Sequence, residues 1–301
     1  MDINYELYKV FYHVASTLSF SEASKQLFIS QSAVSQSIKT LERKLDQTLF
    51  IRSTKHVQLT PEGEILLRHI EPAMHFIRRG EAQLLDAAST GGQIRIGASD
   101  TICRYFLVPF LERFHRDFPA AHIKVINQTS IKCVELLETG QVDLIVTNYP
   151  NAYLSNVSSI HKIKSFKDVF IAGKAFEQLK DQPLSYEDLS KYPILMLDKK
   201  STTSEFLHRL FQQHHLDLVP EVELTSNDLL IDLARIGLGI AFVPDFCITK
   251  QMSDLFIVKT KEELPGRELV IAYNEQIPLT KASEEFLNYF KSNTPQQDDG
   301  A

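Results

Sequence analysis

The stretch from Gln31 to Leu45 (QSAVSQSIKTLERKL) alternates apolar and polar residues at helical spacing. Its apolar positions, which recur at intervals of three and four, are Val34, Ile38, Leu41 and Leu45. They share one helical face, so the pattern predicts a helix packed against a core. The opposite face consists of Gln31, Ser32, Ser35, Gln36, Lys39 and Arg43. A solvent-facing helix usually carries Glu, Lys and Ala, because serine hydroxyls compete with the backbone for hydrogen bonds. This face therefore indicates a partner outside the domain.

Two further helices are predicted before this stretch. Residues 5–16 (YELYKVFYHVAS) place apolar side chains on one helical stripe. Ser21 is the expected N-cap of a short second helix ending near Phe28, and Ser30 is the expected N-cap of the helix Gln31–Leu45. Because only two or three residues separate the second and third helices, the spacing is that of a helix-turn-helix.

The third helix is followed by the pattern of a small hairpin. Residues 49–52 and 57–60 read as two short extended pieces around a basic turn at residues 53–56. Three helices followed by such a hairpin predict a winged helix-turn-helix over residues 1–60.

A long helix is expected after the hairpin, with Thr60 as its cap and Pro61 as its first residue, running to about Ala88. Its apolar stripe, interrupted near Gly80, is Leu66, Ile70, Ala73, Ile77, Leu84 and Ala88. A stripe this narrow is typical of contact with another helix, so residues 61–89 are expected to form a linker and dimerisation helix. Packing of the stripe on its own domain is the alternative. The sequence STGGQ at residues 89–93 predicts a flexible joint.

From Ile94 onward the pattern changes to strands alternating with helices. The expected strands are IRIGAS, HIKVINQ, VDLIVTN, DVFIAG, PILML, VEL, GIAFVP and ELVIAYN, and the expected helices cover residues 106–118, 131–138, 203–214, 229–235 and 282–291. This βαβ signature predicts parallel sheets covered by helices. Residues 93–301 are expected to form two α/β lobes, lobe I at about 93–163 and 268–301 and lobe II at about 164–267, with a ligand cleft between them. The chain as a whole is thus an α+β multidomain protein.

The charge distribution refines this picture. The chain of 301 residues has a net charge of −6, which alone argues against nucleic-acid binding. Residues 1–90, however, contain ten Lys/Arg and ten Asp/Glu, so the whole excess of negative charge lies in the remainder. Between Lys25 and Lys55, six basic residues face two acidic ones. The sequence predicts a small basic module joined to an acidic body.

Several classes of protein are not favoured by the sequence. The three cysteines, Cys103, Cys133 and Cys247, contain no C-x-x-C spacing, so buried free thiols are expected rather than a disulfide framework or a zinc site. There is no H-E-x-x-H, G-x-S-x-G, Walker A or G-x-G-x-x-G run, so neither an enzyme, a catalytic residue nor a metal site is expected. No apolar stretch approaches the roughly 18 residues of a membrane helix, and no secretion signal is present, so a cytoplasmic protein without a membrane partner is expected.

The chain resembles the LysR-type transcriptional regulators along nearly its whole length, from about Tyr5 to Phe290. The N-terminal resemblance rests on SQSAVSQSIKTLE, on LF.R at residues 49–52 and on LTPEG at residues 59–63. The C-terminal resemblance rests on IRIGAS, LVPFLERFHRDFP, LLETGQVDLIV and ARIGLGIAFVP, which are similar to that family's effector-binding domain, itself similar to periplasmic binding proteins. The resemblance implies a dimer or a tetramer that binds promoter DNA, with a small-molecule inducer that alters the DNA contacts; RNA polymerase is a further candidate partner.

The residues themselves suggest how DNA is contacted. The N-terminal residues of a recognition helix approach base edges in the major groove, where Gln is a bidentate partner and Ser a short one. Gln31, Ser32, Ser35 and Gln36 are therefore the candidates for base contacts. The candidates for contacts to the DNA backbone are Ser21, Ser24, Lys39 and Arg43, together with Arg52 and Lys55 in the wing. A merely solvated polar face is the alternative for the helix.

Short polar clusters at successive strand-to-helix turns are the candidate effector site. Helix N-termini expose N–H groups and a positive dipole end, so such clusters would suit a small carboxylate or an inorganic anion. The candidates are Ser99, Asp100, Thr101, Thr129, Ser130, Thr147, Ser201, Thr202 and Asn227. The alternative is that each of these residues only caps its helix. No other cofactor is expected. Asp100 and Asp228 would oppose an anion if they pointed inward.

Two alternative functions remain open from the sequence. A thiol-based redox sensor of the same family is one, because Cys103 and Cys133 lie near predicted helix N-termini, where thiolates are stabilised. A solute-binding receptor is the other; it fits the two C-terminal lobes, but it leaves the first 90 residues without a role.

Overall fold

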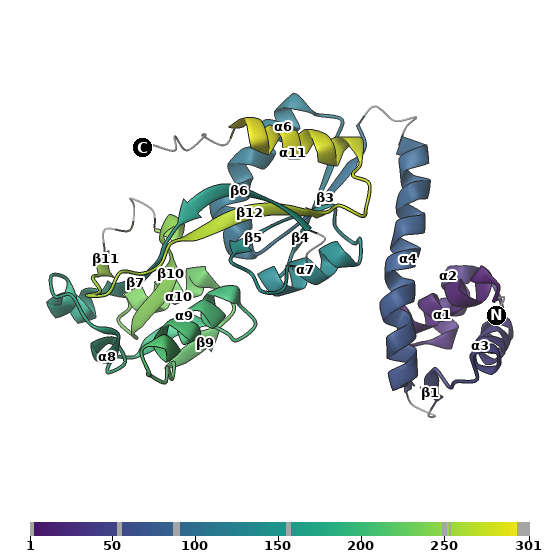
Figure 1. The fold of residues 1–301 in the computed structure, drawn as a ribbon, viewed down its shortest axis with the longest axis horizontal. Helices are drawn as coiled ribbons and strands as arrows, with labels where there is room; N and C mark the ends of the chain where they lie inside the picture. Colours follow the sequence, from purple (N-terminus) through teal and green to yellow (C-terminus); the bar gives the residue numbers. More distant parts are fainter. Residues whose placement is uncertain are drawn as a thin grey trace. The chain divides into compact units, whose positions relative to one another are not determined.

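The chain divides into two compact units, Met1–Leu85 and Asp86–Ala301 (Figure 1). The computed structural model describes residues 3–52, 56–86, 91–154, 158–248, 252 and 254–293. None of the helices within these ranges is both long and apolar enough to cross a bilayer.

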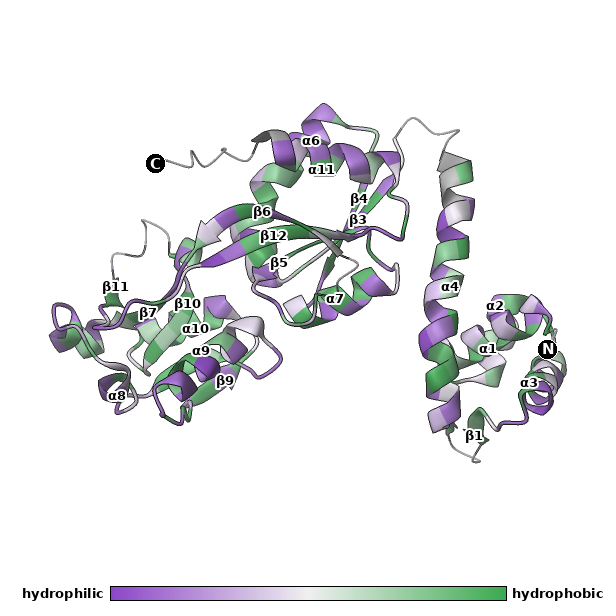
Figure 2. Cartoon of the chain, viewed as in Figure 1, coloured by the Kyte–Doolittle hydropathy of each residue, from purple (hydrophilic) through white to green (hydrophobic). Residues whose placement is uncertain are grey.

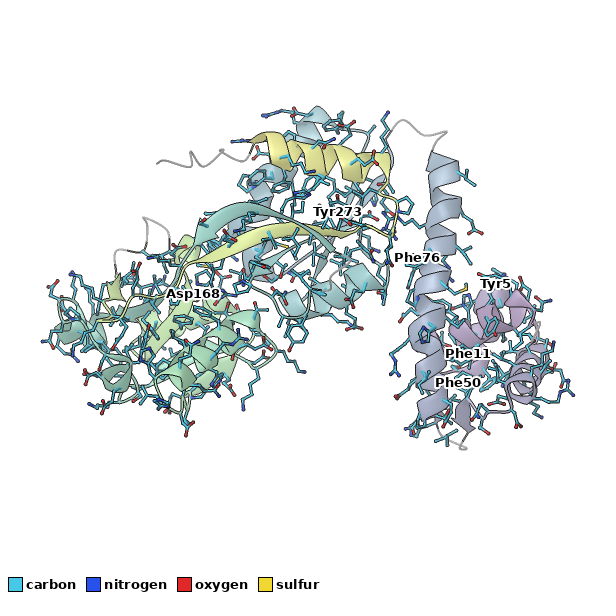
Figure 3. The ribbon with its side chains drawn as sticks, viewed as in Figure 1. Tyr5, Phe11, Phe50, Phe76, Asp168 and Tyr273 are labelled. Atoms are coloured by element: carbon cyan, nitrogen blue, oxygen red, sulfur yellow. The ribbon has the colours of Figure 1, made fainter. Side chains whose placement is uncertain are left out.

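Three helices and a hairpin make up the first part of the N-terminal unit. The helices are α1 (Tyr5–Thr17), α2 (Phe20–Leu27) and α3 (Gln31–Leu45), and the antiparallel strands are β1 (Phe50–Arg52) and β2 (Val57–Leu59). The apolar faces predicted for α1 and α3 are confirmed, because Phe11, Val34 and Ile38 are fully buried in a common core. Phe11 and Phe50 lie with ring centroids 5.5 Å apart, which joins the first helix to the hairpin (Figure 3).

The helix caps follow the sequence with one exception. Ser30 caps α3 as predicted, since its Oγ accepts the N–H of Ala33 at 3.2 Å. The prediction that Ser21 caps α2 is wrong: the cap is Ser19, whose Oγ accepts the N–H of Glu22 at 3.2 Å. Ser19 and Glu22 have the S-x-x-E spacing of a capping box, and the earlier start lets Phe20 reach the core.

The long helix α4 (Pro61–Asp86) begins at the predicted proline, with the Thr60 hydroxyl accepting the N–H of Gly63 at 3.0 Å. Leu66 and Ile70 pack against the core of their own unit, so the first half of the predicted stripe follows the alternative interpretation. Ile77 and Leu84 are exposed, and Ala88 lies outside the described residues. The stripe therefore divides into a packed part and an exposed part.

The C-terminal unit contains two lobes, each built on a five-stranded sheet. Lobe I has the strand order β4-β3-β5-β12-β6. Its strands are β3 (Gln93–Ala98), β4 (His122–Asn127), β5 (Leu144–Tyr149), β6 (Ser158–Phe166) and β12 (Arg267–Asn274). Its helices are α5 (Asp100–Ile102), the π-helical turn η1 (Cys103–Leu107), α6 (Val108–Asp117), α7 (Ser130–Glu138) and α11 (Lys281–Asn293). In Figure 2 the middle of β12 is coloured as hydrophobic, and its middle residues, Leu269, Val270, Ile271 and Ala272, are fully buried, as expected for a strand covered on both faces.

Lobe II repeats this plan with the strand order β11-β7-β10-β8-β9. Its strands are β7 (Asp168–Gly173), β8 (Ile194–Leu197), β9 (Val222–Leu224), β10 (Ile240–Pro244) and β11 (Leu255–Val258). Its helical segments are η2 (Lys174–Leu179), α8 (Tyr186–Leu189), α9 (Thr202–Gln213), α10 (Asn227–Arg235) and η3 (Asp245–Cys247). Gly237 follows α10 with φ +84°, the left-handed conformation that glycine commonly adopts just after the end of a helix.

The sheets differ from the prediction in two respects. Both are mixed rather than parallel, because β12 runs antiparallel to β5 and β7 runs antiparallel to β10. In addition, β6 and β11, which the sequence did not predict, each form an edge strand. Strand β6 pairs with β12 out to Phe166.

One predicted helix is locally distorted. A continuous helical run replaces the helix expected at residues 106–118, and it starts at Asp100 with the π-helical turn η1 in its middle. Pro109 lacks an N–H and its ring crowds the preceding turn, so regular α-helical bonding cannot pass through this point.

The two lobes are joined at a buried charged pair. Arg267 begins β12 and Asp168 begins β7, and Nη1 of the arginine lies 2.7 Å from Oδ2 of the aspartate, with both side chains almost fully buried. The guanidinium also donates to Oγ1 of Thr203 at 3.1 Å and lies between the rings of Phe166 and Phe206. Asp168 marks this junction in Figure 3. Burial raises the pKa of Asp168, and the adjacent Arg267 opposes that rise.

Candidate functional sites

The polar face of α3 is exposed along its length. Gln31, Ser32, Gln36, Lys39 and Arg43 are exposed residues, and Ser35 is half-buried. The Ser32 hydroxyl lies 2.8 Å from that of Ser30, which ties it to the helix cap. This face thus carries amide and hydroxyl groups in the first turns and positive charge further along, an arrangement that can meet base edges and then phosphates.

The turn between α2 and α3 adds features around this face. Ser21 is exposed, while Ser24 is half-buried and donates its hydroxyl to the carbonyl of Ser21 at 2.8 Å. Phe28, which the sequence interpretation used only as a helix end, is 96% exposed in a left-handed conformation with φ 54°. An aromatic ring so exposed beside the polar face is available for apolar contact with a partner.

The wing is only partly described. Arg52 ends β1, and Lys55 lies outside the described residues. The hairpin is held to α3 by Glu42, whose Oε1 accepts the backbone N–H groups of Leu49 at 2.9 Å and Phe50 at 3.3 Å. Glu42 therefore positions the wing rather than simply adding charge to the helix.

A cavity of about 380 Å³ lies between the two lobes. Its described lining is Ser99, Asp100, Thr101, Ile102, Asn127, Gln128, Thr129, Ser130, Asn148, Leu197, Asp198, Ser201, Thr203, Thr225, Ser226, Asn227, Pro244 and Phe246. These residues come from the ends of strands and the starts of helices in both lobes. The volume is near the lower end of the ~300–1,000 Å³ range of small-molecule sites.

Seven of the nine predicted effector residues line this cavity: Ser99, Asp100, Thr101, Thr129, Ser130, Ser201 and Asn227. Three of them also cap helices, as the alternative interpretation expected. Ser99 Oγ accepts the N–H of Ile102 at 3.4 Å, Thr129 Oγ1 that of Lys132 at 3.3 Å, and Ser201 Oγ that of Thr203 at 3.1 Å. Capping and lining therefore coexist in the same side chains.

Thr147 and Thr202, the other two, lie behind the cavity wall. Thr147 is fully buried in β5, where its Oγ1 accepts from Asn151 at 3.2 Å. Successive side chains of a strand point to opposite faces, so the neighbouring Asn148 lines the cavity instead. The Thr202 hydroxyl lies within 3.4 Å of Asn148 Nδ2 and 3.5 Å of Arg267 Nη2, which connects the wall to the buried charged pair.

Other lining residues were not among the predicted ones. Asp198 and Phe246 follow strands of lobe II, whereas Asn127 is the last residue of β4 in lobe I and Gln128 follows it. The position of each at or after the end of a strand is the signal that could have found them, because the carboxyl ends of parallel strands share one edge of a sheet.

Side chains from the two lobes meet around the cavity. Asn227 Nδ2 donates to Thr101 Oγ1 at 2.8 Å. The carboxylate of Asp228 accepts a hydrogen bond from the hydroxyl of Tyr105 and lies 3.6 Å from Nη1 of Arg104. It therefore binds two residues of the other lobe. Away from this cavity, Tyr153 of lobe I donates to Glu205 of lobe II at 2.7 Å. Movement of one lobe against the other would break these contacts.

The cysteines do not have the thiolate character expected of a redox sensor. Burial raises the pKa of Cys103 to about 11 and that of Cys133 to about 12. Burial also raises the pKa of Cys247. Proximity to a helix N-terminus, on which the redox alternative relied, is thus outweighed by desolvation of the thiolate.

The comparison with protein families covers both units. The model for the "Bacterial regulatory helix-turn-helix protein, lysR family" matches residues 5–64, and that for the "LysR substrate binding domain" matches residues 87–295. A probable RuBisCO transcriptional regulator of Synechocystis sp. is 28% identical over 281 residues, which cover 91% of this chain and 81% of the relative.

Solved structures share the fold. The chain matches full-length CbnR complexed with its target DNA with a TM-score of 0.67 and 16% identity, covering 96% of this chain and 99% of CbnR. It matches the regulatory domain of Synechocystis CcmR in complex with 2-PG with a TM-score of 0.62 and 20% identity, covering 68% of this chain and 99% of that domain. Since the substrate-binding-domain model alone matches more than half of the chain, the protein belongs to the LysR family of helix-turn-helix transcriptional regulators and carries that family's effector-binding domain.

Proposed function

We propose that this regulator contacts promoter DNA through the polar face of α3 and that a small, anionic metabolite in the cavity between the lobes modulates this contact. Gln31, Ser32, Ser35 and Gln36 face the bases in this proposal. The backbone contacts come from Ser21, Ser24, Lys39, Arg43, Arg52 and Lys55. The CbnR complex supports the general mode of binding for a protein of this fold.

One observation carries the effector part of the proposal: helix N-termini from both lobes converge on one cavity. The first residues of α7, α9 and α10 are all in its lining or directly behind it. The positive ends of helices stabilise anions, so this geometry suits a carboxylate or an inorganic anion. The binding of 2-PG by the CcmR domain is consistent with a small ligand in this fold.

The coupling proceeds through the lobes. A ligand that binds better to one relative orientation of the lobes shifts the population toward that orientation. In a self-associated regulator, a dimer or a tetramer, such a change alters the spacing of the DNA-binding pairs on the promoter. The exposed part of the α4 stripe, which includes Ile77 and Leu84, is the proposed contact between copies. RNA polymerase is a further proposed partner at the promoter.

The test is a thermal-shift screen of the full chain against small carboxylates and inorganic anions, followed by gel-shift assays with the DNA that flanks its gene. We expect at least one compound to raise the melting temperature and to change the affinity or the extent of the DNA complex. A compound that stabilises the protein without any effect on DNA binding would argue against the coupling.

A further inference from the structure

The charge of the cavity wall does not match a simple anion. Among its described lining residues there is no Lys, Arg or His, but there are two carboxylates, Asp100 from lobe I and Asp198 from lobe II. Asp100 is exposed and Asp198 is half-buried, and an anion in the cavity would meet these two like charges, which weaken its binding. The two carboxylates therefore favour a ligand that carries a positive charge in addition to a negative one.

Both carboxylates keep acceptor capacity. Asp100 Oδ1 accepts from Asn127 Nδ2 at 3.0 Å, and Asp198 Oδ1 accepts the backbone N–H of Lys200 at 3.1 Å. The second oxygen of each has no hydrogen-bond donor within the part of the chain that the structure describes. A carboxylate oxygen in this situation is a strong partner for an ammonium group.

Two buried amide oxygens of residues that line the cavity also lack a hydrogen-bond donor. Asn148 and Asn227 donate their Nδ2 groups to Thr202 at 3.4 Å and to Thr101 at 2.8 Å. Both asparagines are more than nine-tenths buried, and the Oδ1 atom of each accepts no hydrogen bond from any described residue. An unsatisfied buried acceptor is costly, so a ligand that supplies N–H donors gains affinity at this wall.

The same cavity nevertheless favours a carboxylate at the starts of α7, α9 and α10, each of which is at least nine residues long. Opposite requirements thus lie in one small volume: helix N-termini that attract an oxyanion, and carboxylate and amide oxygens that attract an ammonium group.

We propose that the effector is a small zwitterion that bears both a carboxylate and an ammonium group, as an α-amino acid does. This inference rests on the proposed function, in which the cavity holds the effector, and it replaces the simple anion of that proposal by a carboxylate that also carries an ammonium group. The carboxylate binds at the helix N-termini, and the ammonium group binds between Asp100 and Asp198 with the aid of the two asparagine oxygens.

The first experiment uses the full wild-type chain. The twenty standard L-amino acids are screened by thermal shift, and calorimetry then compares the best of them with its 2-hydroxy acid and with its carboxamide. Each analogue removes one of the two charges. We expect both analogues to bind at least about tenfold more weakly than the amino acid. If no amino acid raises the melting temperature, or if the 2-hydroxy acid binds as tightly, the inference is wrong.

The second experiment assigns the ammonium site. In the double variant Asp100→Asn with Asp198→Asn, the advantage of the amino acid over its hydroxy acid is expected to fall to within about threefold. Asp217→Asn, which changes an exposed aspartate of lobe II outside the cavity lining, is the matched control and should keep the full advantage. An undiminished advantage in the double variant overturns the assignment.

These outcomes distinguish failure of the zwitterion inference from failure of the proposed function. If a hydroxy acid or an inorganic anion, rather than an amino acid, binds and changes DNA affinity, the proposed function stands and the zwitterion inference falls. If an amino acid binds with the expected selectivity but leaves DNA affinity unchanged, the coupling in the proposed function falls instead.

Discussion

The polar face of α3 comes from one helix and is exposed, whereas the cavity is lined by residues spread from Ser99 to Phe246 and is tied to a buried network. On α3 the core and the candidate contact residues occupy separate faces, so the contact residues can vary without disturbing folding. Around the cavity, Thr203 lines the wall and also accepts from Arg267, so one residue serves both the ligand site and the junction of the lobes. Under the proposed function, specificity for DNA is therefore separable from stability, while specificity for the effector is not.

The largest expected effect is a loss of stability when the buried pair of Arg267 and Asp168 is broken. Arg267→Met leaves Asp168 buried without its ion partner, and breaking a buried pair in this way costs about 3–5 kcal/mol in the free energy of unfolding. Chemical denaturation of the full chain measures it. The control is Arg104→Met, which removes an exposed partner of Asp228 and should cost no more than about 1 kcal/mol. Equal losses in the two variants would contradict the role given to the buried pair.

The next effect concerns base contacts. Gln36→Ala should weaken binding to the cognate promoter by about 1–3 kcal/mol and leave binding to random DNA nearly unchanged, because a Gln–base contact is sequence-specific. Its free energy of unfolding should change by less than about 0.5 kcal/mol, since the side chain is exposed. Gel-shift titrations on both DNAs decide the point, and equal losses on the two would remove Gln36 from the base-reading residues.

A smaller effect, on the salt dependence of DNA binding, is expected at the positively charged end of the polar face of α3. Lys39→Ala should weaken binding on every sequence and reduce the slope of log affinity against log salt concentration by about 1, as the loss of one phosphate contact does. The same test applies to Lys55→Ala in the wing. A salt slope identical to that of the wild type would show that Lys39 makes no phosphate contact.

The smallest effect is expected at the thiols. With the pKa of Cys103 raised to about 11, the thiol is protonated at neutral pH, and its alkylation rate should rise about tenfold per pH unit between pH 7 and 10. Mild peroxide at pH 7 should leave Cys103 and Cys133 without an adduct or a disulfide, as seen by mass spectrometry. Rapid modification of either residue at neutral pH would restore the redox-sensing alternative.

The same comparison explains which features sequence reasoning could predict. Helix α3, its cap at Ser30 and its buried face follow from local spacing, because a helix orders residues that are close in the chain. Strands β6 and β11 escaped prediction because they pair antiparallel, with β12 and β7, and stand outside the alternation of strand and helix that marks parallel strands. The edge strands β4 and β9 belong to that alternation and were predicted.

The cavity was harder to predict because its composition depends on topology. Capping serines such as Ser99 and Ser201 could be found from their places before helices, but Asp198 and Phe246 become neighbours of lobe I only once the lobes pack. Likewise, Thr147 and Asn148 are adjacent in sequence, and only the pleat of β5 decides which one lines the cavity.

The central claim is that occupancy of the cavity changes DNA binding, and Thr101→Val tests it most directly. Thr101 lines the cavity and accepts from Asn227 of the other lobe, yet it belongs to the unit that does not contain α3. Fluorescence anisotropy would measure affinity for promoter DNA with and without the best compound from the screen, in wild type and variant. The account predicts that the compound changes the wild-type affinity, and that Thr101→Val binds DNA as the ligand-free wild type does but no longer responds. An unchanged response in the variant would contradict it.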